Sequence, residues 1–146
     1  IKYLYGVLEK QFRNYFKKAA KKDGPTGDNL LIMLESRLDN TIYRLGLAST
    51  RSAARQIVSH KHILINNKIV NIPSYNLSAG DIIKVRDKSK KNIVFQESMR
   101  RIQGDNPMPW LSLDKSKLEG IFEQLPERQQ IEEPVNEQLV VELYSK

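Results

Sequence analysis

The chain has 146 residues, enough for one good hydrophobic core or two small domains, and 40% of them are hydrophobic, so it is expected to fold. Its formal net charge of +7 favours a polyanionic partner, and the absence of cysteine excludes disulfides, thiolate zinc sites and cysteine nucleophiles. No apolar run approaches the roughly 20 residues that a membrane span needs, so no membrane partner is expected.

The positive charge is concentrated in the first two thirds of the chain. Residues 1–101 carry 20 Lys and Arg against 8 Asp and Glu, whereas residues 102–146 carry 4 against 9. A polyanion should therefore meet residues 1–101. The chain begins at Ile1 rather than at methionine, and we expect a further segment before it.

A basic amphipathic helix is predicted over residues 2–22, ended by Asp23-Gly24-Pro25. Its apolar stripe consists of Tyr5, Leu8, Phe12, Tyr15 and Phe16. Its remaining surface is strongly positive, with Lys10, Arg13, Lys17, Lys18, Lys21 and Lys22. A helix lying on a membrane surface could have this pattern, but a globular chain follows directly, so we favour an RNA-facing helix with Lys10, Arg13 and Lys17 as contacts.

A second helix is predicted from Asp28, its N-cap, to Gly46, which would end it. Its core positions keep a spacing of three to four residues, at Leu31, Leu34, Leu38, Ile42 and Leu45. Arg37 and Arg44 lie off this stripe and are candidate RNA contacts. Glu35 and Asp39 are one helical turn apart, and we expect them to pair with arginines rather than to act as acid and base.

Residues 50–73 are predicted to form a short basic helix followed by a β-hairpin. Thr50 is the expected N-cap of a helix that ends near Lys61, and Ile63–Ile65 is the first strand. Asn66-Asn67 suits a tight turn because asparagine tolerates positive φ, and Lys68–Ile72 returns as the second strand. Pro73 ends that strand.

This helix and turn present hydrogen-bond donors without a matching set of acids. Such donors suit phosphates, 2′-hydroxyls and base edges, so the segment is a candidate RNA-binding surface. The alternative is a solvated helix face with an ordinary polar turn, and the stretch alone supports both interpretations equally. The candidate residues are Thr50, Arg51, Ser52, Arg55, Gln56, Ser59, His60, Lys61, Asn66, Asn67 and Lys68.

The motifs of catalysis and of cofactor binding are absent. His60 and His62 are the only histidines, and no carboxylate cluster accompanies them, so we predict no metal site. No glycine-rich phosphate-binding loop occurs, and no cofactor is expected. Arg37-Leu38-Asp39 resembles a signature of some pseudouridine synthases, but it falls inside an amphipathic helix and no large catalytic domain follows it.

The rest of the chain predicts a small sheet and two further helices. We expect a connector at 74–80 with a helical turn around Tyr75–Leu77, and strands at 82–85, 110–113 and 118–122. Between and after these strands we expect a basic run at 86–91, a helix over Asn92–Ile102, a loop at 104–109, an acidic linker at 126–134 and a last helix capped by Asn136. The predicted class is α+β, with a helical lobe and a module of helices packed on a small antiparallel sheet.

Four stretches of the sequence resemble a known family. Residues 36–86, SRLDNTIYRLGLASTRSAARQIVSHKHILINNKIVNIPSYNLSAGDIIKVR, resemble the RNA-binding module named after ribosomal protein S-four. YGVLEKQFRNYFKKA before it, and PWLSLDKSKLEGIFEQLPER and NEQLVVELYSK after it, are similar to the bacterial small-subunit S-four family itself. That module also occurs in pseudouridine synthases, tyrosyl-tRNA synthetases and a heat-shock ribosome-associated protein.

The resemblance implies a non-enzymatic structural component of the small ribosomal subunit in the cytoplasm. Such proteins bind the small-subunit ribosomal RNA at a multi-helix junction of its 5′ domain early in assembly, beside protein S-five and near the path by which mRNA enters. It also implies two domains, 1–35 with 136–146 and 36–135, and a module helix at Thr50–Lys61 that faces RNA.

Two differences from the family limit what it implies. The family's longer N-terminal region, which binds zinc in some members, is not in this chain, and residues 123–133 are more acidic than their counterparts. Two alternatives stay open, an RNA-modifying enzyme fragment and a ribosome-rescue or stress factor that uses the same module.

Overall fold

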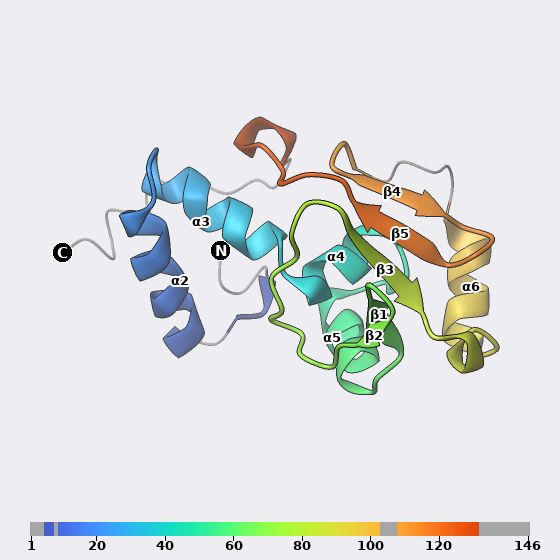
Figure 1. The fold of residues 1–146 in the computed structure, drawn as a ribbon. Helices are drawn as coiled ribbons and strands as arrows, with labels where there is room; N and C mark the ends of the chain where they lie inside the picture. The colour runs from blue at the N-terminus through green and yellow to red at the C-terminus, as the bar shows by residue number, and fades with distance from the viewer. Residues whose placement is uncertain (1–4, 8, 103–107, 132–146) are drawn as a thin grey trace. The chain divides into compact units, whose positions relative to one another are not determined.

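The computed structural model describes residues 5–7, 9–102 and 108–131. They form helices and a five-stranded antiparallel sheet, which confirms the predicted α+β class (Figure 1). The chain divides into two compact units, the second of which is Ser36–Leu125; the first contains the described residues before Ser36 and after Leu125. The predicted boundary at 135/136 and the predicted helix after Asn136 lie outside the described residues, so the division predicted from the sequence stays a prediction.

The first unit contains the helices α2 (Glu9–Lys21) and α3 (Thr26–Glu35) and the 3₁₀-helix η2 (Arg128–Gln130). Helix α2 buries Phe12 and Tyr15 of the predicted apolar stripe and also Ala19, whereas Phe16 is half-buried. The helix expected over 2–22 is interrupted before Glu9, because Gly6 has a φ of 68° and leaves the right-handed helical region. Residues 1–4 and Leu8 lie outside the described residues.

Helix α3 begins at Thr26, so the prediction of Asp28 as its N-cap was wrong. The chain turns at Gly24, which has a φ of 96°. The side-chain amide of Asn29 donates to the carbonyls of Ala19 and Asp23, both at 3.2 Å, and this holds the corner between the two helices. The basic side chains of α2 are left on the outer surface of the corner.

The single helix predicted from Asp28 to Gly46 is interrupted at Ser36 and Arg37. Helix α4 (Leu38–Arg44) follows the break, at which Arg37 has an extended backbone with φ −67° and ψ 146°. The backbone N–H of Leu38 donates to the Tyr75 carbonyl at 2.8 Å, and the Ser36 carbonyl accepts from Leu77 at 2.9 Å. These bonds to a distant segment replace helical ones, and they also explain why the predicted helical turn at Tyr75–Leu77 is absent.

The predicted helix and hairpin are present as α5 (Arg51–Ser59), β1 (Ile63–Ile65) and β2 (Lys68–Ile69). Thr50 is the N-cap, because its hydroxyl accepts from the Ala53 N–H at 3.0 Å. Asn66 and Asn67 have φ values of 51° and 69°, which matches the tight turn predicted for this pair. The second strand is shorter than predicted.

The remaining elements complete the sheet. They are β3 (Asp81–Val85), the 3₁₀-helix η1 (Asp87–Ser89), α6 (Ile93–Arg101), β4 (Leu111–Asp114) and β5 (Glu119–Phe122). The strand order is β2-β1-β3-β5-β4 and all neighbours are antiparallel. The strands and the α6 cap at Asn92, which accepts from the Val94 N–H at 3.0 Å, confirm the predictions for this region. Most of the expected loop at 104–109 lies outside the described residues.

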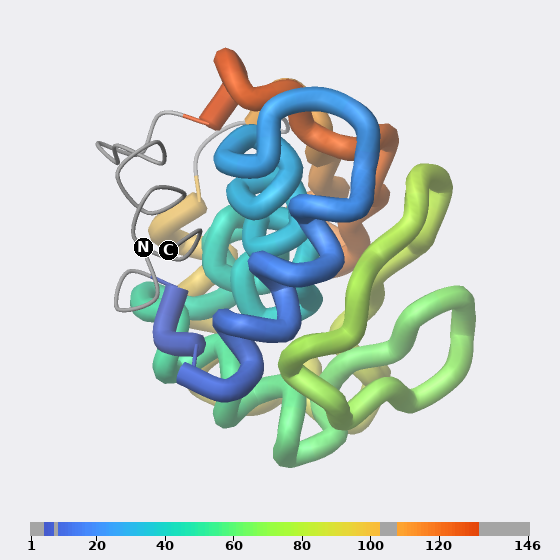
Figure 2. Tube along the Cα trace, turned by 90° about the vertical axis from the view of Figure 1, so that its left-hand side faces the viewer, coloured from blue at the N-terminus to red at the C-terminus, as the bar shows by residue number. Residues whose placement is uncertain are grey.

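Helices α4 and α5 cover one face of the sheet (Figure 1). In the turned view of Figure 2, the hairpin and the chain that leads into β3 lie to the right of these helices. Gly120 lets strand β5 pack closely against Leu45 after α4, because a Cβ there would lie 3.0 Å from Leu45 Cδ1. Helix α6 holds the connection between α4 and α5, since the Ser98 hydroxyl donates to the Leu47 carbonyl at 3.0 Å. The donor-bearing helix α5 is therefore mounted on a rigid support. None of the described helices is long and apolar enough to cross a membrane.

Candidate RNA-binding surface

Helix α5 has one apolar face and one donor face. Ala54, Ile57 and Val58 are buried. Ser52, Gln56 and Ser59 are exposed, and Arg51 and Arg55 are half-buried. None of the nine residues of α5 is acidic, so the exposed side attracts anions.

Arg55 carries a donor that lacks a partner. Its Nη1 is buried and makes no hydrogen bond in the described part of the chain. A buried unsatisfied donor costs about 1–3 kcal/mol, and more when the group is charged. Arg55 as a whole is only half-buried, so the part of its side chain that reaches solvent on this side of α5 can still donate to a phosphate or sugar oxygen.

The N-terminal end of α5 is coupled to α4 through an aromatic ring. The Arg51 guanidinium lies 4.6 Å from the centroid of the Tyr43 ring, and its Nε donates to Asn40 Oδ1 at 2.8 Å. Arg44 lies 5.8 Å from the same centroid. Two predicted RNA contacts, Arg44 and Arg51, thus flank one half-buried tyrosine and present their charge from a fixed position.

The hairpin turn is largely engaged within the fold. The Asn66 amide donates to Asp81 Oδ1 at 3.0 Å and accepts from the Ile82 N–H at 2.9 Å. Asn67 Oδ1 accepts from Lys84 Nζ at 3.2 Å. Lys68 is exposed. All three predicted turn contacts are exposed, and Lys68 is the one whose side chain makes no hydrogen bond or ion pair with the described residues.

Arg37 lies in the interior of the second unit. Its side chain is 3% exposed and pairs with Asp39, with Nε to Oδ1 and Nη2 to Oδ2 both at 3.0 Å. Asp39 also accepts from the Asn40 N–H at 2.7 Å. Asp39 is therefore paired with an arginine, as predicted, and its carboxylate stabilises the start of α4.

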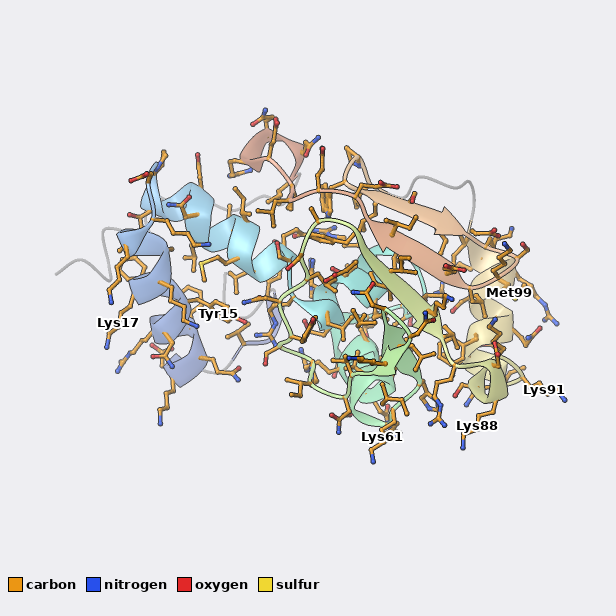
Figure 3. The ribbon with its side chains drawn as sticks, in the orientation of Figure 1. Tyr15, Lys17, Lys61, Lys88, Lys91 and Met99 are labelled. Carbon is orange, nitrogen blue, oxygen red and sulfur yellow. The ribbon has the colours of Figure 1, made fainter. Side chains whose placement is uncertain are left out.

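Lys10, Arg13 and Lys17 lie exposed on α2 in the first unit. Figure 3 shows Lys17 pointing away from the helix. Arg13 pairs with Glu9 one turn before it, at 3.3 Å, and because both side chains are well exposed this pair contributes little to stability. The three cations keep the positive character predicted for this helix.

His60 and His62 differ in their surroundings. His60 is exposed, whereas His62 Nδ1 lies 2.8 Å from the Ser89 hydroxyl and its ring meets Phe95 edge-on. Burial, followed by the charges of His60 and Arg86, lowers the pKa of His62. The described residues contain no group of three side chains that could hold a metal ion.

The folded chain also brings in cations to which the sequence assigned no role. Arg86 Nη1 donates to the Lys61 carbonyl at 3.2 Å, which places the basic run at 86–91 beside the end of α5. The signal was visible as Arg-Asp-Lys-Ser-Lys-Lys, but its position next to Lys61 depends on a long-range contact. The second unit thus offers donors and positive charge along α5, which suits binding to a polyanion rather than catalysis.

Two family models match the chain. The model of the S4 domain matches residues 36–83, and the model described as ribosomal protein S4/S9 N-terminal domain matches residues 1–35. Together they cover the first unit's helices and most of the helix–hairpin module.

Full-length comparison finds bacterial relatives that are each called small ribosomal subunit protein uS4. The relative from Lachnospira eligens is 54% identical over 145 residues, which are 99% of this chain and 74% of that protein. The relatives from Chromobacterium violaceum and Laribacter hongkongensis are each 52% identical over 146 residues, which are all of this chain and 71% of each protein.

Proposed function

The chain belongs to the uS4 family of small ribosomal subunit proteins, and from this premise we propose that it binds small-subunit ribosomal RNA directly at a multi-helix junction of the 5′ domain. As a member of that family it is a structural component of the ribosome in the bacterial cytoplasm, and it is not an enzyme. Ribosomal RNA and other ribosomal proteins are its expected partners.

The observation that carries the proposal is the donor face of α5, whose polar side chains are exposed or half-buried and include no acid. Arg55, with Arg51, Ser52 and Gln56, would hold one RNA segment through phosphate, sugar and base-edge hydrogen bonds. Lys10, Arg13 and Lys17 of α2, together with Arg44, Ser59, His60, Lys61 and Lys68, would add phosphate contacts. Binding would then release counterions and depend steeply on salt.

Some predicted residues would hold this surface in place, Arg37 from the interior and Thr50, Asn66 and Asn67 from exposed positions. Arg37, Asn66 and Asn67 are bonded to other parts of the second unit, and Thr50 caps α5. We assign them the role of positioning the elements that present the donors. This protein would thereby read the shape of a folded junction, nucleate assembly there, and lie beside protein S-five and the path by which mRNA enters.

A competition binding experiment tests the proposal. Labelled 5′-domain RNA is bound to the protein at physiological salt, and unlabelled competitors are added, either the same RNA or one whose junction helices have been unpaired by mutation. The intact junction should compete far better than the altered one. Equal competition would mean that charge alone drives binding, and the junction assignment would be wrong.

A rescue factor and a structural component can be distinguished by how long each stays on the subunit. A rescue factor leaves the subunit during a cycle of binding and release, whereas a structural component stays at one copy per subunit through a high-salt wash. The family assignment favours the structural component.

A further inference from the structure

Four cations from two distant segments form one patch at the end of α5. We define the turn patch as Lys61, Arg86, Lys88 and Lys91. Figure 3 shows the side chains of Lys61, Lys88 and Lys91 directed outward along one edge of the second unit. Three of these four residues belong to the segment between β3 and α6, to which the sequence assigned no contact.

The fold holds the two segments together by specific hydrogen bonds. Lys61 has a φ of 67°, which ends α5 and turns the chain into β1. The Arg86 N–H donates to the His62 carbonyl at 2.9 Å, and its guanidinium donates to the Lys61 carbonyl at 3.2 Å. His62 Nδ1 and the Ser89 hydroxyl lie 2.8 Å apart. The patch is therefore a built surface whose backbone is fixed.

The charge of the patch is poorly balanced by the protein itself. Within residues 60–62 and 86–92 the only acid is Asp87, and its carboxylate pairs with Lys90 at 3.1 Å. In the described part of the chain the ammonium groups of Lys61, Lys88 and Lys91 have no partner. Lys88 and Lys91 also precede the N-terminus of α6, where the helix dipole disfavours cations. A polyanion bound there would pair with the lysine charges and would also offset their unfavourable interaction with the α6 dipole.

The chemistry of the patch differs from that of the α5 donor face. The donor face has a tyrosine flanked by arginines, hydroxyls and an amide, which can distinguish sugar and base edges. The turn patch has flexible lysines, which act as point charges toward phosphates and carry no sequence information. It lies at the C-terminal end of α5, about 14 Å of helix from the first donor of the other surface.

We propose that the turn patch is a second RNA-binding surface, which holds the phosphate backbone and strengthens binding without selecting the site. This rests on the proposed function and assigns to the β3–α6 segment a part in it. The patch should supply a share of the salt dependence, whereas the donor face of α5 supplies the selectivity for the junction.

The test compares two double variants that each remove two positive charges from exposed side chains. One is Lys88→Gln with Lys91→Gln, and the control is Arg100→Gln with Lys117→Gln, which are exposed and lie outside both surfaces and outside α2. Losing two phosphate contacts should make the slope of log K against log salt less steep by about 1.8. The ratio of the wild-type binding constant to that of the variant should therefore fall about tenfold between 50 and 200 mM salt. The control should change the slope much less, and both variants should keep the preference for the intact junction.

Proximity is measured separately through single cysteines, because the natural chain has none. An iron chelate attached to Lys88→Cys should cleave small-subunit RNA in the reconstituted complex, and one attached to Ser52→Cys marks the donor face. Cleavage from position 52 without cleavage from 88, or equal slopes for the two double variants, would overturn the turn patch alone. If the wild-type protein bound the intact and the altered junction equally well, the proposed function would be wrong instead.

Discussion

Replacing Arg55 with alanine should weaken RNA binding while leaving the stability of the fold nearly unchanged. Arg55 is half-buried on the donor face of α5, so we expect the part of its side chain that reaches solvent to donate to an RNA oxygen. A hydrogen bond to a charged group contributes about 1.5–3 kcal/mol, and a loss of about 2 kcal/mol corresponds to binding about 30-fold weaker. Filter binding to 5′-domain RNA at about 150 mM salt measures this effect.

The stability of the Arg55→Ala variant should be nearly unchanged. Truncation loses the packing of the arginine stem but removes an unsatisfied buried donor, and these two effects oppose each other. We expect a melting temperature within about 2 °C of the wild type. Arg100→Ala is the control for the loss of one charge, since Arg100 is exposed on α6. Binding by Arg55→Ala equal to that of the control would refute the reasoning, as would a large fall in melting temperature.

Three further changes test the interior of the second unit. Arg37→Ala would leave the carboxylate of Asp39 buried and unpaired, which should cost about 3–5 kcal/mol in urea denaturation, and a wild-type midpoint would contradict the pairing. Gly120→Ala should reduce the free energy of unfolding by about 1–3 kcal/mol and lower the melting temperature, because its Cβ would lie 3.0 Å from Leu45 Cδ1. An unchanged melting temperature would show that Leu45 moves aside freely. Burial lowers the pKa of His62, so the unfolded chain binds a proton there at higher pH than the folded one, and the free energy of unfolding should fall as the pH drops below 6.5. This dependence should be weaker in His62→Gln, and an equal dependence in both proteins would count against it.

Elements with local signals were predictable from the sequence. Thr50 has a hydroxyl in the place where a helix needs a cap, and Asn66-Asn67 separates two short apolar runs rich in isoleucine and valine with a pair that tolerates positive φ. Each of these features is decided by residues close in the sequence, so the pattern and the structure agree.

Features that depend on distant residues were not predictable. The helix predicted across Arg37 breaks because backbone groups near it bond to the segment around Tyr75, and a periodicity of leucines contains no information on that contact. The same holds for the site. Exposure along α5 followed from the helical spacing, but the commitment of Asn66 to Asp81 and the approach of Arg86 to Lys61 required the fold.

We propose that this protein recognises one folded junction in the small-subunit RNA. Chemical footprinting of the naked RNA, with and without the purified chain and over a series of salt concentrations, tests it most directly. The account predicts protection concentrated at one multi-helix junction of the 5′ domain, persisting at physiological salt while overall affinity falls with the salt concentration. Diffuse protection that disappears at moderate salt would contradict it.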